Sequence, residues 1–438
     1  MDGKSYDLET QVLRELKGRF VSISLEDERK ALIASTARRL KPNATDEEIA
    51  AMTTDIFDLG PLKSALNMET VEDIMVNNTE NIFVYDSQTG EKKLPDKVQS
   101  RRELDLLVDK LKLFATNEIA GNNILDVHMP DGSRANIVTS PVGYNVTIRR
   151  FKQKAMSIID LINYGELDYQ IAARLWIYTD GFRARPANML IGGMPAAGKT
   201  TLLNAMFSFF RPEARIITIE ETYELDTTTQ ENCVRLETST DMPMEELVKN
   251  ALRMRPDMIV IGEVRGMEAN DMITAMNIGK ICIGTIHASS ARDIVNRLQH
   301  SPMNVPKDII PVIDSLISLS QIYEGGKPVR KITQISEISG IETQILLSDL
   351  YKFDYKTHKA APILSSVTYR DTICELLGVP PPALLAEEDV RANILYAMNK
   401  QGMRDIVSIN NMVKDYYDSP EATLKKLGLG NLSPSIRI

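Results

Sequence analysis

Short apolar runs alternate with helix-patterned segments in the middle of the chain, from about residue 159 onward. Four of these runs read NMLIGG, ARIITIE, DMIVIGE and ICIGTIH. Apolar strands separated by helices are typical of a mostly parallel sheet that is buried on both faces. Between the second and third runs, apolar residues from Met244 to Leu252 recur at helical spacing, and Pro256 ends that helix. The pattern therefore predicts an α/β domain over residues 153–350.

The chain before this domain shows two other patterns. Residues 1–60 read as helical, with a break at Lys41–Thr45 after which Asn43 and Thr45 are suitable helix caps. Residues 61–152 read as a smaller α+β domain, because short β-rich runs are separated by turn-forming pairs such as Thr89-Gly90. We expect a joint near Lys152–Ile158.

After the α/β domain the apolar spacing becomes helical again. Val390, Ile394, Leu395 and Met398 share one face of a predicted helix. Residues 351–438 are therefore expected to form a C-terminal helical region.

Composition and charge narrow the class of protein. The 438 residues include 51 Lys and Arg against 60 Asp and Glu, a formal net charge of −9. This acidic balance argues against a protein that coats nucleic acid nonspecifically, so no direct nucleic-acid partner is expected. The three cysteines form no metal-binding spacing, which favours reduced thiols in a cytoplasmic protein. No signal peptide or membrane-spanning stretch is recognised, so membrane contact is expected to be peripheral.

The stretch GMPAAGKT, Gly193 to Thr200, fits the phosphate-loop pattern G-x-x-x-x-G-K-[ST]. A predicted strand precedes it and a predicted helix follows, as this motif requires. Backbone N–H groups and the helix N-terminus would hold phosphate, Lys199 would bridge the β- and γ-phosphates, and Thr200 would hold Mg²⁺. The predicted nucleotide-binding residues are Gly193, Met194, Pro195, Ala196, Ala197, Gly198, Lys199, Thr200 and Thr201.

Polar residues stand at the ends of three further buried strands. Glu263 ends DMIVIGE, with Gly262 where a switch GTPase would have an aspartate, and Glu220 and Glu221 follow ITI. His287 ends ICIGTIH. Ligands in open α/β sheets lie at the carboxyl ends of the strands, so these side chains are expected to converge on the phosphates. No NKxD base-reading motif and no kinase-type lid are found. The predicted Mg²⁺ ligands are Thr200, Glu220 and Glu263.

The order of these motifs resembles the type II/type IV secretion ATPase superfamily. It runs from GGMPAAGKTTLLNA through IEETYEL and LVKNALRMRPDMIVIGEVRG to GTIHA. Upstream, VEDIMVN, MPDGSRAN and VTIRRF resemble the Tad/CpaF branch, whereas ANILYAMNKQGMRDIVSINNMVKDYYDSPE resembles archaeal pilus and archaellum ATPases. The chain departs from the family at Glu221, Lys280 and Ser289, where Asp, His and Asn are common.

The resemblance implies a RecA-like P-loop core in a homohexameric ring that hydrolyses ATP with Mg²⁺. Such a ring drives type IV or Tad pilus assembly, retraction or type II-like secretion through inner-membrane platform proteins. It also assigns roles to the candidate catalytic residues. Glu263 would position water, Glu220 and Glu221 would shape the metal site, and His287 would sense the γ-phosphate.

Four arginines are candidates for neutralising phosphate charge, as arginine fingers do. They are Arg134, Arg149 and Arg150 in the α+β domain and Arg265 two residues past Glu263. The alternative interpretation is that these arginines are solvated or form interdomain salt bridges, and that Arg265 is a structural ion-pair partner. Two other functions also stay open at this stage, a RecA-like nucleic-acid translocase and an ATP-binding scaffold with little turnover.

Overall fold

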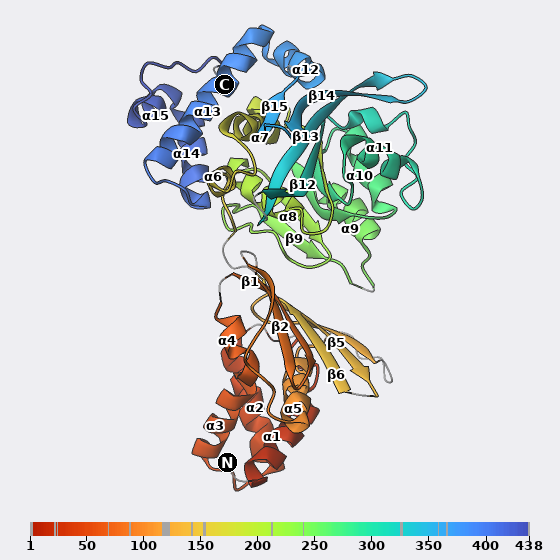
Figure 1. Cartoon of the computed structure of the whole chain (residues 1–438), viewed down its shortest axis with the longest axis vertical. Helices are drawn as coiled ribbons and strands as arrows, with labels where there is room; N and C mark the ends of the chain where they lie inside the picture. The colour runs from red at the N-terminus through yellow and green to blue at the C-terminus, as the bar shows by residue number, and fades with distance from the viewer. Residues whose placement is uncertain are drawn as a thin grey trace. The chain divides into compact units, whose positions relative to one another are not determined.

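The chain divides into two compact units, residues 1–153 and 154–438, which are described separately (Figure 1). The computed structural model describes residues 3–21, 23, 25–68, 70–86, 89–115, 123–141, 143–151, 155–211, 213–239, 241–324, 327–357, 359–364 and 367–436. The boundary between the units falls within the expected joint, of which residues 152–154 lie outside the described part.

The first unit combines helices with a six-stranded antiparallel sheet in the order β3-β2-β1-β6-β5-β4. Apolar residues of its helix α5 face two cores, because Leu107 lies in the sheet core and Leu106 lies in the core of the N-terminal helices. The elements are α1 (Gly3–Leu16), α2 (Glu26–Leu40), α3 (Asp46–Phe57), η1 (Gly60–Leu62), α4 (Lys63–Leu66), β1 (Val71–Asn78), β2 (Asn81–Asp86), β3 (Gly90–Lys93), α5 (Arg101–Lys112), β4 (Ile124–His128), β5 (Arg134–Ser140) and β6 (Gly143–Arg149).

Local sequence explains where these elements begin and turn. Thr45 caps α3 as predicted, since its hydroxyl accepts the Glu48 N–H at 3.1 Å while the Glu48 carboxylate accepts the Thr45 N–H at 3.2 Å. The turn between β4 and β5 contains Gly132 at φ +84°, where a Cβ would lie 2.9 Å from Phe151 Cγ. Only glycine fits this turn without a shift of that ring.

The second unit contains a nine-stranded sheet in the order β15-β14-β13-β12-β7-β11-β10-β8-β9. Its elements are α6 (Ile158–Asn163), α7 (Tyr169–Asp180), η2 (Gly181–Arg183), β7 (Met189–Gly193), α8 (Lys199–Met206), η3 (Phe207–Phe209), β8 (Ile216–Glu220), β9 (Cys233–Glu237), α9 (Met244–Ala251), η4 (Leu252–Met254), β10 (Met258–Val264), α10 (Glu268–Asn277), β11 (Ile281–Ile286), α11 (Ala291–Gln299), η5 (Ile310–Val312), β12 (Ser315–Glu324), β13 (Lys327–Ile341), β14 (Ile345–Asp354), β15 (Lys359–Pro362), α12 (Thr368–Leu377), α13 (Pro381–Lys400), α14 (Ile406–Asp418) and α15 (Pro420–Lys426).

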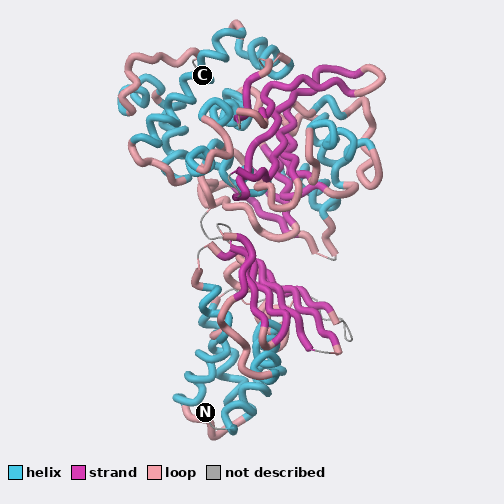
Figure 2. The backbone as a smooth tube through the Cα atoms, in the orientation of Figure 1, coloured by secondary structure: helices cyan, strands magenta, loops and turns pink. Residues whose placement is uncertain are grey.

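In the order of the sheet, the six neighbouring strands β12, β7, β11, β10, β8 and β9 pair in parallel. The strands β12, β13, β14 and β15 pair antiparallel. Successive residues of the parallel strands enter different cores. In β10, Val260 packs with α7 and α8 on one face, and Ile261 packs with α9, α10 and α11 on the other. Figure 2 shows the strands of this unit running between helices on both sides. Burial on both faces explains why these strands read as continuous apolar runs.

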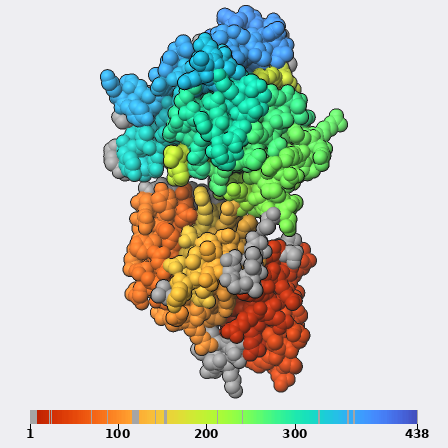
Figure 3. All heavy atoms as spheres, turned by 90° about the vertical axis from the view of Figure 1, so that its right-hand side faces the viewer, coloured from red at the N-terminus to blue at the C-terminus, as the bar shows by residue number. Residues whose placement is uncertain are grey.

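The C-terminal helices join the core of the α/β part of the second unit. Strands β14 and β15 carry the sheet to Pro362, so the helical region begins at Thr368 and not at residue 351 as expected. Helix α13 packs against α7 through a fully buried ion pair, in which Arg391 Nη1 lies 2.6 Å from Asp180 Oδ2. Within α13, Arg391 Nε also lies 3.2 Å from Glu387 Oε1. Figure 3 shows the C-terminal part of the chain, in blue, directly against the cyan and green residues of the same unit.

Two further sequence expectations concern single features. Cys233, Cys282 and Cys374 are free thiols, the last two buried. Among the helices that the structure describes, none is both long and apolar enough to cross a membrane.

Candidate functional site

The loop from Gly193 to Lys199 connects the buried strand β7 to the start of helix α8. Gly198 has φ +97° and Ala196 has φ +63°, so the chain turns sharply just before the helix. At Gly193 a Cβ would lie 2.9 Å from Ala197 Cβ and 3.2 Å from Leu319 O, which makes glycine necessary there. The loop thus closes around its own backbone beside the N–H groups of the first turn of α8, an arrangement that binds anions.

The ammonium of Lys199 lies inside this loop. Its Nζ donates to Gly193 O at 3.0 Å and lies 3.3 Å from His287 Nδ1. The residue is 8% exposed, and burial lowers the pKa of Lys199 although the charge of Glu263 opposes this. Because an ammonium only donates, Nδ1 of His287 must accept, which places the imidazole proton on Nε2.

On its other side, His287 contacts a group of charged residues at the ends of β8 and β10. Its Nε2 is in close contact with Glu263 Oε1, although the pair does not have hydrogen-bond geometry, and Arg265 Nη2 lies 2.5 Å from Glu263 Oε2. Arg265 Nη1 also lies 3.1 Å from Glu221 Oε2. Burial and the Lys199 charge lower the pKa of His287, which agrees with a neutral ring. Burial alone would raise the pKa of Glu263, but the Arg265 hydrogen bond and the surrounding cations hold it below the usual range.

Glu220 and Glu221 are neighbours in sequence with different surroundings. Glu220 is 2% exposed, and its Oε2 accepts the N–H groups of Glu224 at 2.7 Å and Leu225 at 2.9 Å. Glu221 is exposed and bonds to Arg265. The structure therefore brings Glu221, Glu263, Arg265, His287 and Lys199 into one set of contacts, whereas the Glu220 carboxylate fixes the loop that follows β8.

Gly262 shows why no aspartate precedes Glu263. A Cβ at Gly262 would lie 3.2 Å from Glu220 Cγ and 3.5 Å from Glu220 Cα. The neighbouring strand β8 therefore occupies the space that a side chain at position 262 would need. Thr285 strengthens the contact on the other side of β10, because its hydroxyl donates to Gly262 O at 2.6 Å.

Glu220 should make stability depend on pH. Burial raises the pKa of Glu220 to about 7, above the ordinary value of 4.5 that applies in the unfolded chain. Between these values the native state binds more protons, so stability falls as pH rises from about 4.5 to 7. Glu220→Gln keeps an acceptor for the two N–H groups and removes this cost. We expect the difference in free energy of unfolding between Glu220→Gln and the wild type to be about 1–2 kcal/mol more favourable to the variant at pH 8 than at pH 5. Thermal unfolding at both pH values measures this, with Glu246→Gln on the exposed face of α9 as the control.

The remaining loop residues lie as follows. Met194 is 57% exposed and Ala197 is 1% exposed, while Pro195 and Ala196 are exposed. Thr200 and Thr201 are half-buried in the first turn of α8. A Mg²⁺ site at a nucleotide-binding loop needs few protein ligands, because Mg²⁺ keeps several waters and binds phosphate oxygens as well. Among the described residues there is no group of three or more His, Cys, Asp and Glu side chains placed to hold a metal ion. A loop with one threonine hydroxyl at its helix start fits that mode of binding.

Sequence reasoning missed three residues that contact the loop or its helix. Asn204 of α8 donates to Glu224 O at 2.9 Å and accepts the Asp226 N–H at 2.7 Å, which ties the loop after β8 to the phosphate-loop helix. Arg330 Nε donates to Ala196 O at 3.1 Å, and the carboxylate of Glu166 lies close to Gly198. Asn204 could have been found as a polar residue on a buried helix face, but Arg330 and Glu166 carry no local signal.

The three arginines of the first unit have different positions on its sheet. Arg134 and Arg149 are direct cross-strand partners, and Arg149 also faces Asp73 of β1, so they share one face of the sheet. The guanidinium of Arg150 instead donates to the backbone carbonyl of Met68 within the same unit and lies 3.4 Å from Val71 O. Arg150 is therefore engaged in holding its own unit together.

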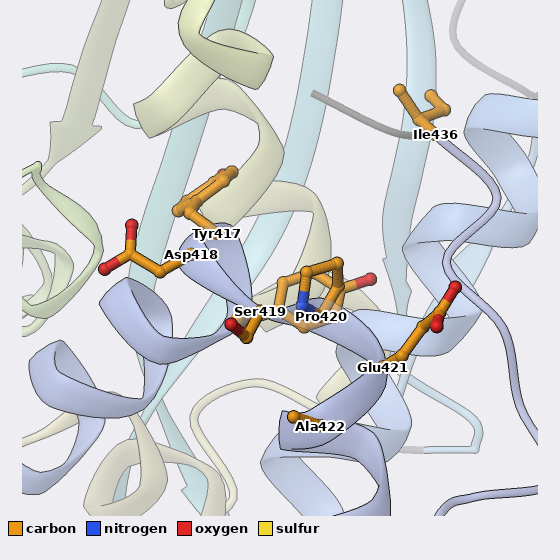
Figure 4. A pocket seen from close by; sticks show the side chains of 8 residues that line it. Tyr417, Asp418, Ser419, Pro420, Glu421, Ala422 and Ile436 are labelled. Atoms are coloured by element: carbon orange, nitrogen blue, oxygen red, sulfur yellow. The ribbon is translucent and has the colours of Figure 1, made fainter.

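A separate cavity of about 460 Å³ lies in the C-terminal helical region. It is lined by residues at the junction of α14 and α15, from Tyr416 to Ala422, and by Ile436 (Figure 4). No residue predicted to bind nucleotide or to act in catalysis lines it. The cavity therefore belongs to the helical region and not to the phosphate loop.

Comparison with known proteins gives a family-model match and several relatives. The family model described as "Type II/IV secretion system protein" matches residues 56–332. Protein MJ0781 of Methanocaldococcus jannaschii is 40% identical over 237 residues, which cover 50% of this chain and 32% of that protein. MJ0900 of the same organism is 28% identical over 399 residues, 87% of this chain and 71% of that protein. The chain thus spans only about a third of the first of these relatives.

Several solved structures match over most of the chain at low identity. One of them, the crystal structure of the pilus retraction motor PilT with bound ADP, is 16% identical, with a TM-score of 0.48, and the match covers 84% of this chain and 96% of PilT.

Proposed function

Because the chain belongs to the type II/IV secretion system protein family, we propose that it hydrolyses ATP at the Gly193–Thr200 loop to drive a membrane-bound machine. The machine would assemble or retract a pilus of the type IV or Tad class, or secrete protein, at the cytoplasmic membrane. The observation that carries the proposal is the series of contacts from Lys199 through His287 to Glu263. This series connects the residue that would hold phosphate with the residue that would position water.

The contacts of Lys199 suggest how phosphate binding would be sensed. Anionic phosphate oxygens accept stronger hydrogen bonds from an ammonium than a neutral imidazole or a carbonyl does. Binding of the triphosphate would therefore draw Lys199 Nζ away from His287 Nδ1 and Gly193 O. His287 would then be free to turn so that its Nε2–H donates to Glu263 Oε1, which has no hydrogen-bond partner among the described residues. In this way the imidazole would report the presence of phosphate to the carboxylate that orients water.

Glu263 and Arg265 would serve positioning and charge. The low pKa of Glu263 keeps its carboxylate ionised, as a group that orients or accepts a proton from water must be. Arg265 holds that carboxylate and Glu221 together, which fixes the direction of the Glu263 side chain. Thr200, together with Glu220 or Glu263, would contribute to a Mg²⁺ site, and the ion would neutralise charge on the transferred phosphate.

The proposal extends to the assembly. We propose that the chain forms a homohexameric ring, which works with inner-membrane platform proteins of a pilus or secretion system. Two relatives come from an archaeon, and the C-terminal segment resembles archaeal pilus ATPases, which favours a Tad-like archaeal role.

Steady-state ATP hydrolysis by the full chain with Mg²⁺ tests the proposal. We expect turnover that single- or double-stranded nucleic acid leaves unchanged. Stimulation by nucleic acid would assign the chain to the translocases instead. Tight ATP binding without turnover in the assembled state would support the scaffold function.

Arg134→Ala is expected to lower kcat about tenfold while ATP affinity changes less than about twofold, if this arginine neutralises charge that develops in the transition state. The measurement is kcat and KM at the protein concentration where the oligomer forms. Arg101→Ala, on an exposed position of α5, is the matched control in the same unit. An equal loss of binding and turnover would make Arg134 a structural residue.

A further inference from the structure

Two ionisable residues that are distant in the sequence lie close to one side of the phosphate loop. Arg330 on β13 donates from Nε to Ala196 O at 3.1 Å, and its Cδ lies 3.1 Å from the position of a Cβ on Gly198. Glu166, between α6 and α7, brings Oε2 within 3.8 Å of that same Cβ position. Arg330 and Glu166 therefore flank the residue directly before Lys199.

Arg330 supports backbone that is unfavourable by itself. Ala196 has φ +63°, a conformation that residues with a Cβ rarely adopt. The guanidinium holds the carbonyl of this residue and so stabilises the turn that directs the loop N–H groups inward. The same group places a positive charge beside the loop.

Glu166 brings the opposite charge to the same place. It is 7% exposed, and among the described residues its Oε2 has no hydrogen-bond partner. Its backbone is fixed, because Glu166 N donates to Leu161 O at 2.9 Å and Glu166 O accepts the Ile332 N–H at 2.9 Å. Burial raises the pKa of Glu166 to about 7, although the charges of Arg330 and Lys331 oppose this. The protein thus keeps a poorly solvated carboxyl group next to an anion-binding loop.

We propose that Arg330 and Glu166 are opposing positioning residues of the phosphate loop, Arg330 favouring and Glu166 disfavouring the binding of a nucleoside triphosphate. This inference rests on the proposed function, since it takes the triphosphate as the ligand of the loop. At pH 8, above its raised pKa of about 7, Glu166 is mostly a carboxylate and repels a nearby polyanion, and the guanidinium of Arg330 attracts it. Affinity would then be set by the balance of the two groups, which allows the nucleotide to be released after each cycle.

Substitutions of the two residues should change affinity in opposite directions. Arg330→Gln is expected to weaken binding about tenfold, and Glu166→Gln is expected to tighten it about threefold. The KM for ATP should follow these changes, and kcat should change less. If both residues were purely structural, both variants would bind more weakly. Arg292→Gln is the matched control, because Arg292 Nη1 also donates to a backbone carbonyl, that of Ile345, at 2.8 Å.

The experiment is calorimetric titration of the full-length variants with adenylyl imidodiphosphate and Mg²⁺ at pH 8, accompanied by unfolding temperatures and kcat and KM for ATP. Opposite shifts in affinity, with Arg292→Gln within about twofold of the wild type, support the inference. Unchanged affinity in the two variants, or weaker affinity in both, overturns the inference. If the wild type still hydrolyses ATP in that case, the proposed function stands. Failure of the wild type to bind the analogue overturns both. If Arg330→Gln does not fold, Arg330→Lys keeps the charge without the Nε donor and should bind about threefold more weakly; unchanged binding overturns the inference.

Discussion

Lys199→Ala is expected to weaken ATP binding by at least about 100-fold and to abolish hydrolysis at millimolar ATP. The ammonium lies within the loop, 3.0 Å from Gly193 O, and nearly all of its surface is withdrawn from water. A charge-assisted bond from such a buried group to phosphate is strong, and alanine leaves the phosphate charge uncompensated in the same place. Equilibrium binding of an ATP analogue with Mg²⁺ measures the loss directly.

Lys307→Ala is the matched control for this loss. Lys307 also donates to backbone carbonyls, those of Glu342 and Thr343, but on another part of the same unit. Its variant should bind ATP as the wild type does. Tight binding by Lys199→Ala would remove the assignment of Gly193–Thr200 as the nucleotide site, whatever the other variants show.

Glu263→Gln is expected to bind ATP with near-normal affinity and to hydrolyse it about 100- to 1,000-fold more slowly. Glutamine has the shape of glutamate but only one acceptor oxygen, so it can keep the contact with Arg265 or with His287 but not both, and it cannot accept a proton from water. Because the low pKa of Glu263 keeps the wild-type carboxylate ionised, this loss should appear across neutral pH. Single-turnover kinetics separate the chemical step from product release.

Glu221→Gln provides the comparison for Glu263, since both carboxylates bond to Arg265. Glu221 is exposed and lacks the contact with His287, so its variant should retain most of the turnover. A greater loss of turnover in Glu221→Gln than in Glu263→Gln would assign the water-positioning role to Glu221. The proposal that the protein is an ATPase would still stand.

Residues 193–200 determine much of their own structure. The loop could be predicted from the sequence because its signals are local. They are the glycines at positions 193 and 198, the buried strand before them and the helix after them. The same holds for the apolar runs that form β7, β8, β10 and β11 and for the Thr45 cap. Likewise, polar residues at strand ends predicted that Glu263 and His287 would lie near the loop, and these two are in contact.

Other features depended on how distant segments meet. Glu220 and Glu221 are equivalent in a sequence pattern, but Glu220 is the last residue of β8 and is buried against its own loop, whereas Glu221 lies in the bend after the strand and pairs with Arg265. The extra strands to Pro362 and the packing of α13 on α7 were also missed, since a strand or helix pattern does not name its partner.

The sequence by itself determined a phosphate loop and the polar strand ends, because each depends on residues within a few positions of one another. Only the tertiary structure decided that His287 joins Lys199 to Glu263, that Gly262 makes room for Glu220, and that Arg330 reaches Ala196 from 134 residues away. Such contacts are set by strand order and register, which bring together residues whose own neighbours give no sign of the encounter.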